Sequence, residues 1–256
     1  METTTAPDGT TLAYDRVGNG PALVFVSGVF NLRDTCAPIA AQLADAFTCF
    51  TYDRRARGDS SNTAPYAVER EVEDLQAVID VAGGRAAVFG YSSGATLALR
   101  AAADGLPIDR LFLYEPPFRF ENPPAADLPE RLQRMVDEGR AADVVTTFQL
   151  EGIGLPPDMV AGIRQSPFFP QLEAMAQSVV HDATLTAQHP VPTPAMAAVQ
   201  VPTVVMRGGQ TWPVLTVAAE RLAAMLPGAR LQVLSGAADH GLEPRSTAAA
   251  IREASA

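Results

Sequence analysis

The stretch Gly90-Tyr91-Ser92-Ser93-Gly94 decides the fold of this chain. Its G-x-S-x-G form is typical of a sharp turn between a strand and a helix, on which the central serine stands exposed as a nucleophile. The two outer glycines lack a Cβ, so strand and helix can approach each other closely around that serine. Residues 85–90 form a short apolar run that fits a buried parallel strand, and residues 95–103 are rich in Ala and Leu, which favour helix. This context predicts that Ser92 is a nucleophile.

On both sides of this turn, predicted strands alternate with predicted helices. A hairpin around Asp8-Gly9 opens the chain. Further strands are expected at 22–26, 47–52, 85–90, 110–114, 202–206 and 231–234, and helices at 32–46, 68–79, 95–103 and 215–226. Such alternation predicts an α/β fold with a mostly parallel eight-stranded sheet covered by helices, whose ligands bind at the carboxyl ends of the strands. Val29, Ser92 and Glu115 all fall at such ends.

Residues 121–199 interrupt this alternation. They hold ten of the chain's 21 prolines and several short helical patterns, but no strand signal. We therefore predict a core formed by residues 1–120 and 200–256, and a helical lid formed by residues 121–199.

The composition excludes some classes of partner. A net charge of −10 disfavours nucleic acid and anionic membranes, because both would repel an acidic surface. Residues 1–7 lack the basic start and apolar region of a signal peptide, and no apolar run approaches the roughly eighteen residues of a membrane span. We expect a cytoplasmic protein that acts on a small molecule. Nothing in the sequence indicates an oligomeric state.

Two features of the sequence could indicate chemistry, and we predict a structural role for both. The only cysteines, Cys36 and Cys49, fit no metal-ligand spacing and are expected to be small buried hydrophobic residues. Five of the eight residues from 53 to 60 are charged, and we favour a structural role for this loop. No metal and no cofactor are predicted.

A serine hydroxyl needs a base within hydrogen-bond reach, and that base needs an acid to fix its tautomer. The sequence has three histidines. His181 and His189 lie in the predicted lid, whereas His240 directly follows the last strand, where the order serine, acid, histidine puts the base. We predict that His240 is the base.

From the first hairpin to His240, the chain resembles the α/β-hydrolase superfamily. The residues that carry this resemblance are Ser27-Gly28, Asp53-Arg54, 90–94 and His240. It implies an oxyanion hole made by the backbone N–H of Ser93 and one N–H from the loop Ser27-Gly28-Val29. Most members have His-Gly in that loop, and here Ser27 replaces the histidine. Gly28 and Val29 both stay candidates for the second donor.

The triad acid departs from the pattern of the superfamily. Most members carry it just after the seventh strand, but here residues 208–212 read Gly-Gly-Gln-Thr-Trp and hold no carboxylate. Glu115 is the candidate acid, whereas Asp239 adjoins the base too closely and Asp182 lies in the predicted lid. A glutamate after the sixth strand, together with Ser-Ser in the turn at 92, resembles the zearalenone lactonases, a small lid-bearing branch.

The resemblance implies a cofactor-free serine hydrolase that acts on an apolar ester or lactone. Two alternatives stay open: a non-hydrolytic lyase or cyclase of secondary metabolism on the same fold, and a catalytically silent binding module. The intact Ser92 and His240 weigh against the silent module. The residues expected to line a substrate pocket between lid and core are Phe118, Phe168, Phe169, His181 and Trp212.

Overall fold

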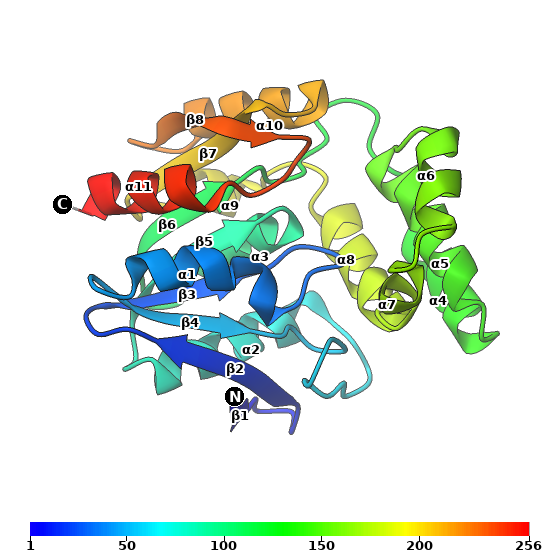
Figure 1. The fold of residues 1–256 in the computed structure, drawn as a ribbon, viewed down its shortest axis with the longest axis horizontal. Helices are drawn as coiled ribbons and strands as arrows, with labels where there is room; N and C mark the ends of the chain where they lie inside the picture. Colours follow the sequence, from blue (N-terminus) through cyan, green and yellow to red (C-terminus); the bar gives the residue numbers. More distant parts are fainter. Residues whose placement is uncertain (256) are drawn as a thin grey trace.

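The computed structural model describes residues 1–255 and shows one eight-stranded sheet (Figure 1). The strand order is β1-β2-β4-β3-β5-β6-β7-β8. The first two strands run antiparallel to their neighbours, and all other neighbouring pairs are parallel. The strands are β1 Glu2–Thr5, β2 Thr11–Val17, β3 Ala22–Val26, β4 Thr48–Tyr52, β5 Ala86–Tyr91, β6 Ile108–Tyr114, β7 Thr203–Gln210 and β8 Arg230–Ala238. The predicted α/β class and the mostly parallel sheet are confirmed.

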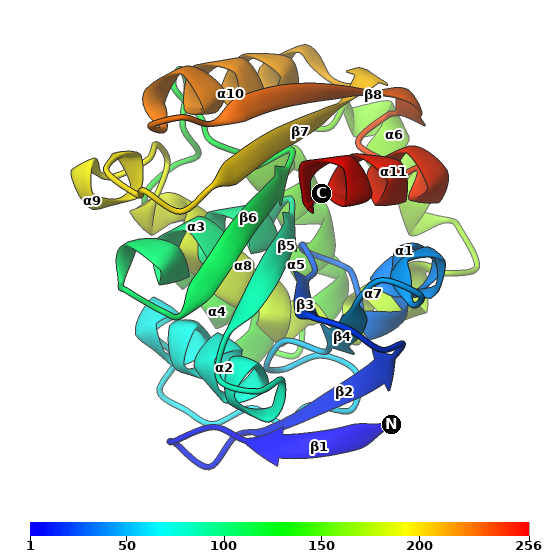
Figure 2. The same cartoon turned by 90° about the vertical axis from the view of Figure 1, so that its left-hand side faces the viewer.

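Alternating side chains of the central strands pack against helices on opposite faces. In β3, Val24 and Val26 belong to the core under α2 (Val68–Val81), α3 (Ser93–Ala103) and α10 (Pro213–Met225). Leu23 and Phe25 belong to the core under α1 (Ala37–Leu43) and α11 (Pro244–Ser255). Figure 2 shows α1 and α11 together on one side of the sheet. Because both faces are covered, a central strand is apolar along its whole length, which explains the continuous apolar runs in the sequence.

The predicted helices are present with shifted ends, and the C-terminal helix α11 was not predicted. The helices are α1 Ala37–Leu43, α2 Val68–Val81, α3 Ser93–Ala103, α4 Leu128–Asp137, α5 Ala141–Thr147, α6 Pro157–Arg164, α7 Phe169–Glu173, α8 Ala176–Gln188, α9 Pro194–Ala197, α10 Pro213–Met225 and α11 Pro244–Ser255. The helix expected over 32–46 is a 3-10 turn, Arg33–Cys36, followed by α1, which begins with proline in its first turn. Within residues 1–255, no helix is long and apolar enough to cross a membrane.

The part of the chain that connects β6 to β7 forms a separate group of helices. In Figure 1, α4, α5, α6 and α7 stand to the right of the sheet, and α8 lies between them and the core. We call α4–α8 the helical insertion. It has its own apolar core, to which Leu132, Phe148 and Val179 contribute. By contrast, α9 packs on the main domain, where Met196 is fully buried in the core over α3.

Candidate active site

Ser92 lies on a tight turn between β5 and α3. Its backbone φ is +56°, a left-handed value that is strained for a residue with a side chain. The flanking glycines are required by close approach: a Cβ on Gly90 would lie 2.5 Å from the Cα of Ala95, and one on Gly94 would lie 2.1 Å from the carbonyl oxygen of Val26. The turn therefore forces Ser92 outward at the carboxyl end of β5.

The imidazole of His240 lies between Ser92 and Glu115. Nε2 of His240 is 2.9 Å from Oγ of Ser92, and Nδ1 is 2.5 Å from Oε2 of Glu115. The other carboxylate oxygen, Oε1, accepts the backbone N–H of Gly208 at 2.7 Å. Glu115 is fully buried, so its carboxylate depends on these two partners. These contacts match the geometry in which a histidine base, oriented by a carboxylate, activates a serine.

The loop that carries His240 is held by two tyrosines of the sheet. The hydroxyl of Tyr91 donates to the carbonyl oxygen of His240 at 2.6 Å, and that of Tyr114 donates to the carbonyl oxygen of Gly241 at 2.8 Å. Glu115 and His240 both have positive φ, at +46° and +63°. Such values persist only where surrounding contacts enforce them, and here the tyrosines and the Gly208 N–H do so.

The loop after β3 passes directly beside Ser92. A Cβ on Gly28 would lie 2.7 Å from the Cβ of Ser92, so only glycine fits at this approach. The carbonyl oxygen of Gly28 accepts a hydrogen bond from the guanidinium of Arg57. Because C=O and N–H of one trans peptide point in opposite directions, this contact turns the N–H of Val29 away from Arg57. Within residues 1–255 neither this N–H nor that of Gly28 has an acceptor, so the orientation of the Gly28–Val29 peptide is the observation that favours Val29 as the oxyanion donor.

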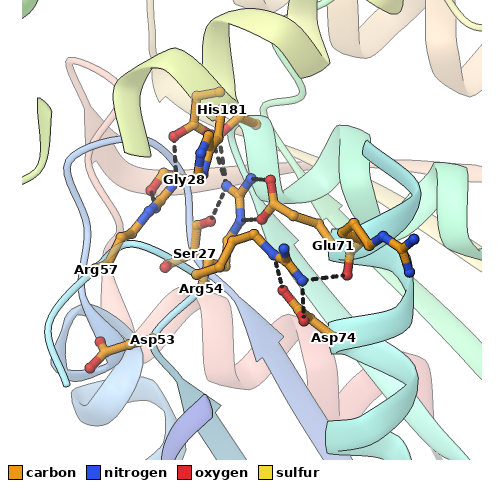
Figure 3. Close-up of polar contacts among 12 residues, drawn as sticks. Ser27, Gly28, Asp53, Arg54, Arg57, Glu71, Asp74 and His181 are labelled. Carbon is orange, nitrogen blue, oxygen red and sulfur yellow. Dashed lines mark hydrogen bonds and ion pairs between the residues drawn. The ribbon is translucent and has the colours of Figure 1, made fainter. Parts of the chain in front are cut away.

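A buried cluster of ion pairs contacts the loop after β3 (Figure 3). Arg54 binds Glu71 through two hydrogen bonds of 2.6 and 2.8 Å and donates to Asp182 of α8 at 2.8 Å. Asp182 also pairs with Arg57 and accepts the hydroxyl of Ser93 at 2.6 Å. All these side chains are buried. The cluster, hereafter the arginine cluster, thus ties the helical insertion to the residue after Ser92.

The charges in the arginine cluster shift one another's pKa. Burial opposes ionisation of Glu71, but Arg54 outweighs it and holds the pKa of that carboxyl at about 2. Arg54 itself, paired with both Asp182 and Glu71, has a raised pKa despite its burial. Burial and the nearby charge of Arg54 lower the pKa of Arg57. Asp182 therefore faces two guanidinium groups that repel each other, and it holds them together.

The charged loop 53–60 has the structural role that we favoured, but it is not a solvated turn. Its three arginines are among the largest fully buried side chains of the chain. Arg55 binds Asp74 through hydrogen bonds of 2.7 and 2.8 Å, next to the arginine cluster. Cys36 and Cys49 are free and buried, as expected, and burial raises the pKa of each thiol to about 12.

A cavity opens at Ser92 between the sheet and the helical insertion. Its lining residues are Val29, Ser92, Ser93, Pro117, Arg119, Pro124, Phe148, Gly152, Ile153, Thr186, Trp212, Val214, Leu215 and His240. Trp212 was expected here, and its ring packs 5.5 Å from that of His240. The cavity is mainly apolar, and Ser92, Ser93 and His240 are among its few polar lining residues, an arrangement typical of a small-molecule site.

The other four residues predicted for the pocket do not line this cavity. Phe118 is buried in the main core under α3 and α10, and Phe169 is buried at the start of α7. Phe168 is 47% exposed on the surface of the insertion. His181 stacks on Tyr66 with ring centroids 3.9 Å apart, behind the arginine cluster. Aromatic composition alone could not separate core, surface and pocket positions.

Nine of the fourteen lining residues escaped the sequence analysis, and three of them stand out. Phe148 and Ile153 come from η2, a π-helical turn at Phe148–Ile153, and π turns are frequent at functional sites. Arg119 follows β6 in the run Pro116-Pro117-Phe118-Arg119. Its position after a strand end was the one sequence signal that could have identified it.

Comparison with known proteins agrees with this geometry. The model of the alpha/beta hydrolase family matches residues 23–250. The crystal structure of an alpha/beta hydrolase from Sphaerobacter thermophilus DSM 20745 superposes with a TM-score of 0.92 at 44% identity, over 100% of both chains. The enol-lactonase from Burkholderia xenovorans LB400 shares the fold, with a TM-score of 0.75 and 20% identity over 99% of both chains.

Curated relatives match over shorter regions. The N-formylmaleamate deformylase of Pseudomonas putida is 34% identical over 131 residues, which are 50% of this chain and 48% of that protein. The match thus spans about half the length of this relative. The family model, in contrast, covers the sheet from β3 to β8, the helical insertion and the residues of the candidate site. This chain therefore belongs to the alpha/beta hydrolase family.

Proposed function

We propose that this protein is a serine hydrolase that cleaves a small, mainly apolar ester or lactone through an acyl-enzyme on Ser92. The observation that carries the proposal is the unbroken chain of contacts from Ser92 Oγ to His240 and on to Glu115, at 2.9 and 2.5 Å. This chain of contacts opens into the apolar cavity. Family membership and the hydrolases among the similar proteins support the reaction class.

In the first half-reaction, Nε2 of His240 takes the proton of Ser92 as Oγ attacks the substrate carbonyl carbon. The resulting oxyanion accepts hydrogen bonds from the N–H groups of Val29 and Ser93. Glu115 stabilises the imidazolium and stays ionised. The carbon–oxygen bond to the leaving group then breaks, and His240 returns its proton to the leaving alkoxide.

In the second half-reaction, His240 deprotonates a water molecule that attacks the acyl-enzyme. The tetrahedral intermediate collapses, Ser92 recovers its proton from His240, and the carboxylic acid leaves. No step needs a metal or an organic cofactor. The walls that Phe148, Ile153 and Thr186 provide assign the helical insertion a lid-like role in substrate choice.

Labelling with a fluorophosphonate, followed by peptide mass spectrometry, tests the nucleophile. The label should lie on Ser92 of the folded enzyme, and it should be absent from heat-denatured enzyme and from Ser92→Ala. Labelling of Ser93 instead, or no labelling at all, would contradict the proposal. Turnover of an ester in H₂¹⁸O should place one ¹⁸O in the acid, which separates hydrolysis from a lyase or cyclase reaction.

A further inference from the structure

Arg119 is a cation in the wall of the cavity without an acidic partner. Its backbone N–H donates to the carbonyl oxygen of Pro190 at 2.6 Å, and one nitrogen of its guanidinium donates to the carbonyl oxygen of Ile153. Within residues 1–255 these are its hydrogen bonds, and no Asp or Glu forms an ion pair with it. Glu121, two positions further on, pairs with Arg221 at 3.2 Å instead.

The surroundings of Arg119 make this unusual. It is the only residue with a permanent charge among the described residues that line the cavity, and it is only partly exposed. Burial lowers the pKa of its guanidinium, and no neighbouring carboxylate opposes this effect. The three fully buried arginines, Arg54, Arg55 and Arg57, each have a carboxylate partner. Arg110, partly exposed like Arg119, donates to the carbonyl oxygen of Ala254 and forms no ion pair within residues 1–255, but it does not line the cavity. Taking a charge out of water without a partner is unfavourable. A negatively charged ligand in the cavity would supply the counter-charge that Arg119 lacks.

The chemistry of the group specifies that ligand. A guanidinium has five N–H donors in a planar fork that matches the two oxygens of a carboxylate. The carbonyl of Ile153 uses one of these donors. We propose that Arg119 binds a carboxylate group that the substrate carries away from its scissile carbonyl. This proposal rests on the proposed hydrolysis and narrows it to esters or lactones of acids that bear a second carboxylate.

The test compares two esters that differ only in this charge: mono-p-nitrophenyl adipate and the same ester with its free carboxyl capped as methyl ester. The kcat/KM of the wild-type enzyme should favour the carboxylate substrate roughly 10-fold or more, the factor of a charge-assisted hydrogen bond. Arg119→Gln should lower this ratio roughly 10- to 100-fold, and Arg119→Lys should fall between the two. Arg134→Gln, an exposed arginine of α4, is the matched control and should keep the wild-type ratio.

The ratio of kcat/KM for the two esters distinguishes a role of Arg119 in substrate binding from a purely structural role. If Arg119 served only to hold the carbonyl of Ile153, Arg119→Gln would slow both esters by the same factor, and the proposal would be overturned. A wild-type ratio near one would overturn it as well. Measurements belong at about 0.15 M ionic strength, where the acidic surface is screened beyond about 8 Å.

Binding provides a readout that does not need turnover. Calorimetry with Ser92→Ala should show that monomethyl adipate binds more tightly than dimethyl adipate, and adding Arg119→Gln should remove the difference. If neither ester is hydrolysed but this difference is found, the proposed function fails while the carboxylate site stands.

Arg119 also borders a second hollow, which Phe120 and Val217 help to line. Competition in the wild-type enzyme distinguishes the two locations. If monomethyl adipate does not inhibit hydrolysis of the capped p-nitrophenyl ester, its carboxylate binds in this second hollow and not in the cavity, and the proposal is overturned.

Discussion

Oε2 of Glu115 lies 2.5 Å from Nδ1 of His240, although 125 residues separate them in the sequence. The contact joins the end of β6 to the loop after β8. Between them lies the end of β7, the position at which the resemblance to the superfamily implies the triad acid. The N–H of Gly208 in β7 holds the second oxygen of Glu115 at 2.7 Å. The backbone at the usual acid position thus orients a carboxylate that comes from the neighbouring strand.

Glu115→Gln should lower kcat by about 10⁴ while the protein stays folded. The amide keeps the shape of the side chain but favours the wrong tautomer of His240, so that Nε2 no longer accepts the proton of Ser92. Hydrolysis of a p-nitrophenyl ester measures the rate, and circular dichroism checks the fold. Glu121→Gln, in an exposed ion pair with Arg221, should keep the wild-type rate and serves as control. A rate within a few-fold of wild type in Glu115→Gln would mean that another group acts as acid.

The loop after β3 allows the oxyanion donor to be tested separately. Val29→Pro removes the backbone N–H that the Gly28–Arg57 contact turns away from Arg57, and it should lower kcat by about 10²- to 10³-fold. Val29→Ala keeps the N–H and should stay within a few-fold of wild type. Equal losses in the two variants would show that the Val29 side chain matters and its N–H does not. Fluorescence-monitored unfolding of both variants establishes that the loop change has not disrupted the core.

The sequence predicted the fold, and the carboxyl ends of β3 to β6 to within one residue, because both follow from local pattern; β7 and β8 run four residues past their predicted ends. Apolar runs of five to seven residues mark strands covered on both faces, and the glycines around Ser92 mark a turn whose close contacts leave no room for a Cβ. The contacts of Ser92, His240 and Glu115 follow from where those strands end. Their catalytic roles stay predictions that the variants above test.

The cavity walls and the arginine cluster could not be predicted in the same way. Asp182 meets Arg54 across 128 residues, and no local pattern encodes which carboxylate neutralises which arginine. Phe168 and Phe148 are both aromatic residues of the insertion, yet one is exposed and the other lines the cavity. The difference depends on how the helical insertion packs on the core, which is a long-range property.

Asp182→Asn should destabilise the protein by about 3–5 kcal/mol, because it leaves the buried guanidinium groups of Arg54 and Arg57 with only Glu71 as counter-charge. For a chain of this size, such a loss lowers Tm by roughly 10 °C. Differential scanning calorimetry measures the shift. Asp143→Asn removes a partly exposed carboxylate that pairs with Arg140, and it should change stability by less than about 1 kcal/mol. Similar Tm values for the two variants would show that the arginine cluster contributes little to the fold.

His181 offers a test of stability against pH. Its ring is buried against Tyr66, and Nδ1 has no hydrogen-bond partner within residues 1–255. Burial lowers the pKa of His181 to about 4, although Glu71 and Asp182 act in the opposite direction. Between pH 6.5 and 4 the unfolded chain therefore binds a proton that the folded chain does not. The contribution of His181 to stability is complete above its unfolded pKa and is lost as the pH falls toward 4.

His181→Phe keeps a ring to stack on Tyr66 but cannot titrate, and it removes the unpaired nitrogen. Relative to wild type, the free energy of unfolding of this variant should rise by about 2 kcal/mol as the pH falls from 7 to 5. Urea unfolding at several values in this range measures it. Burial raises the pKa of Asp74 to about 6, which gives a trend of opposite sign in the same range. Asp74 is present in both proteins, so its contribution cancels in the difference. Parallel stability curves for wild type and variant would show that His181 is protonated in the folded state, and the assigned burial effect would then be wrong.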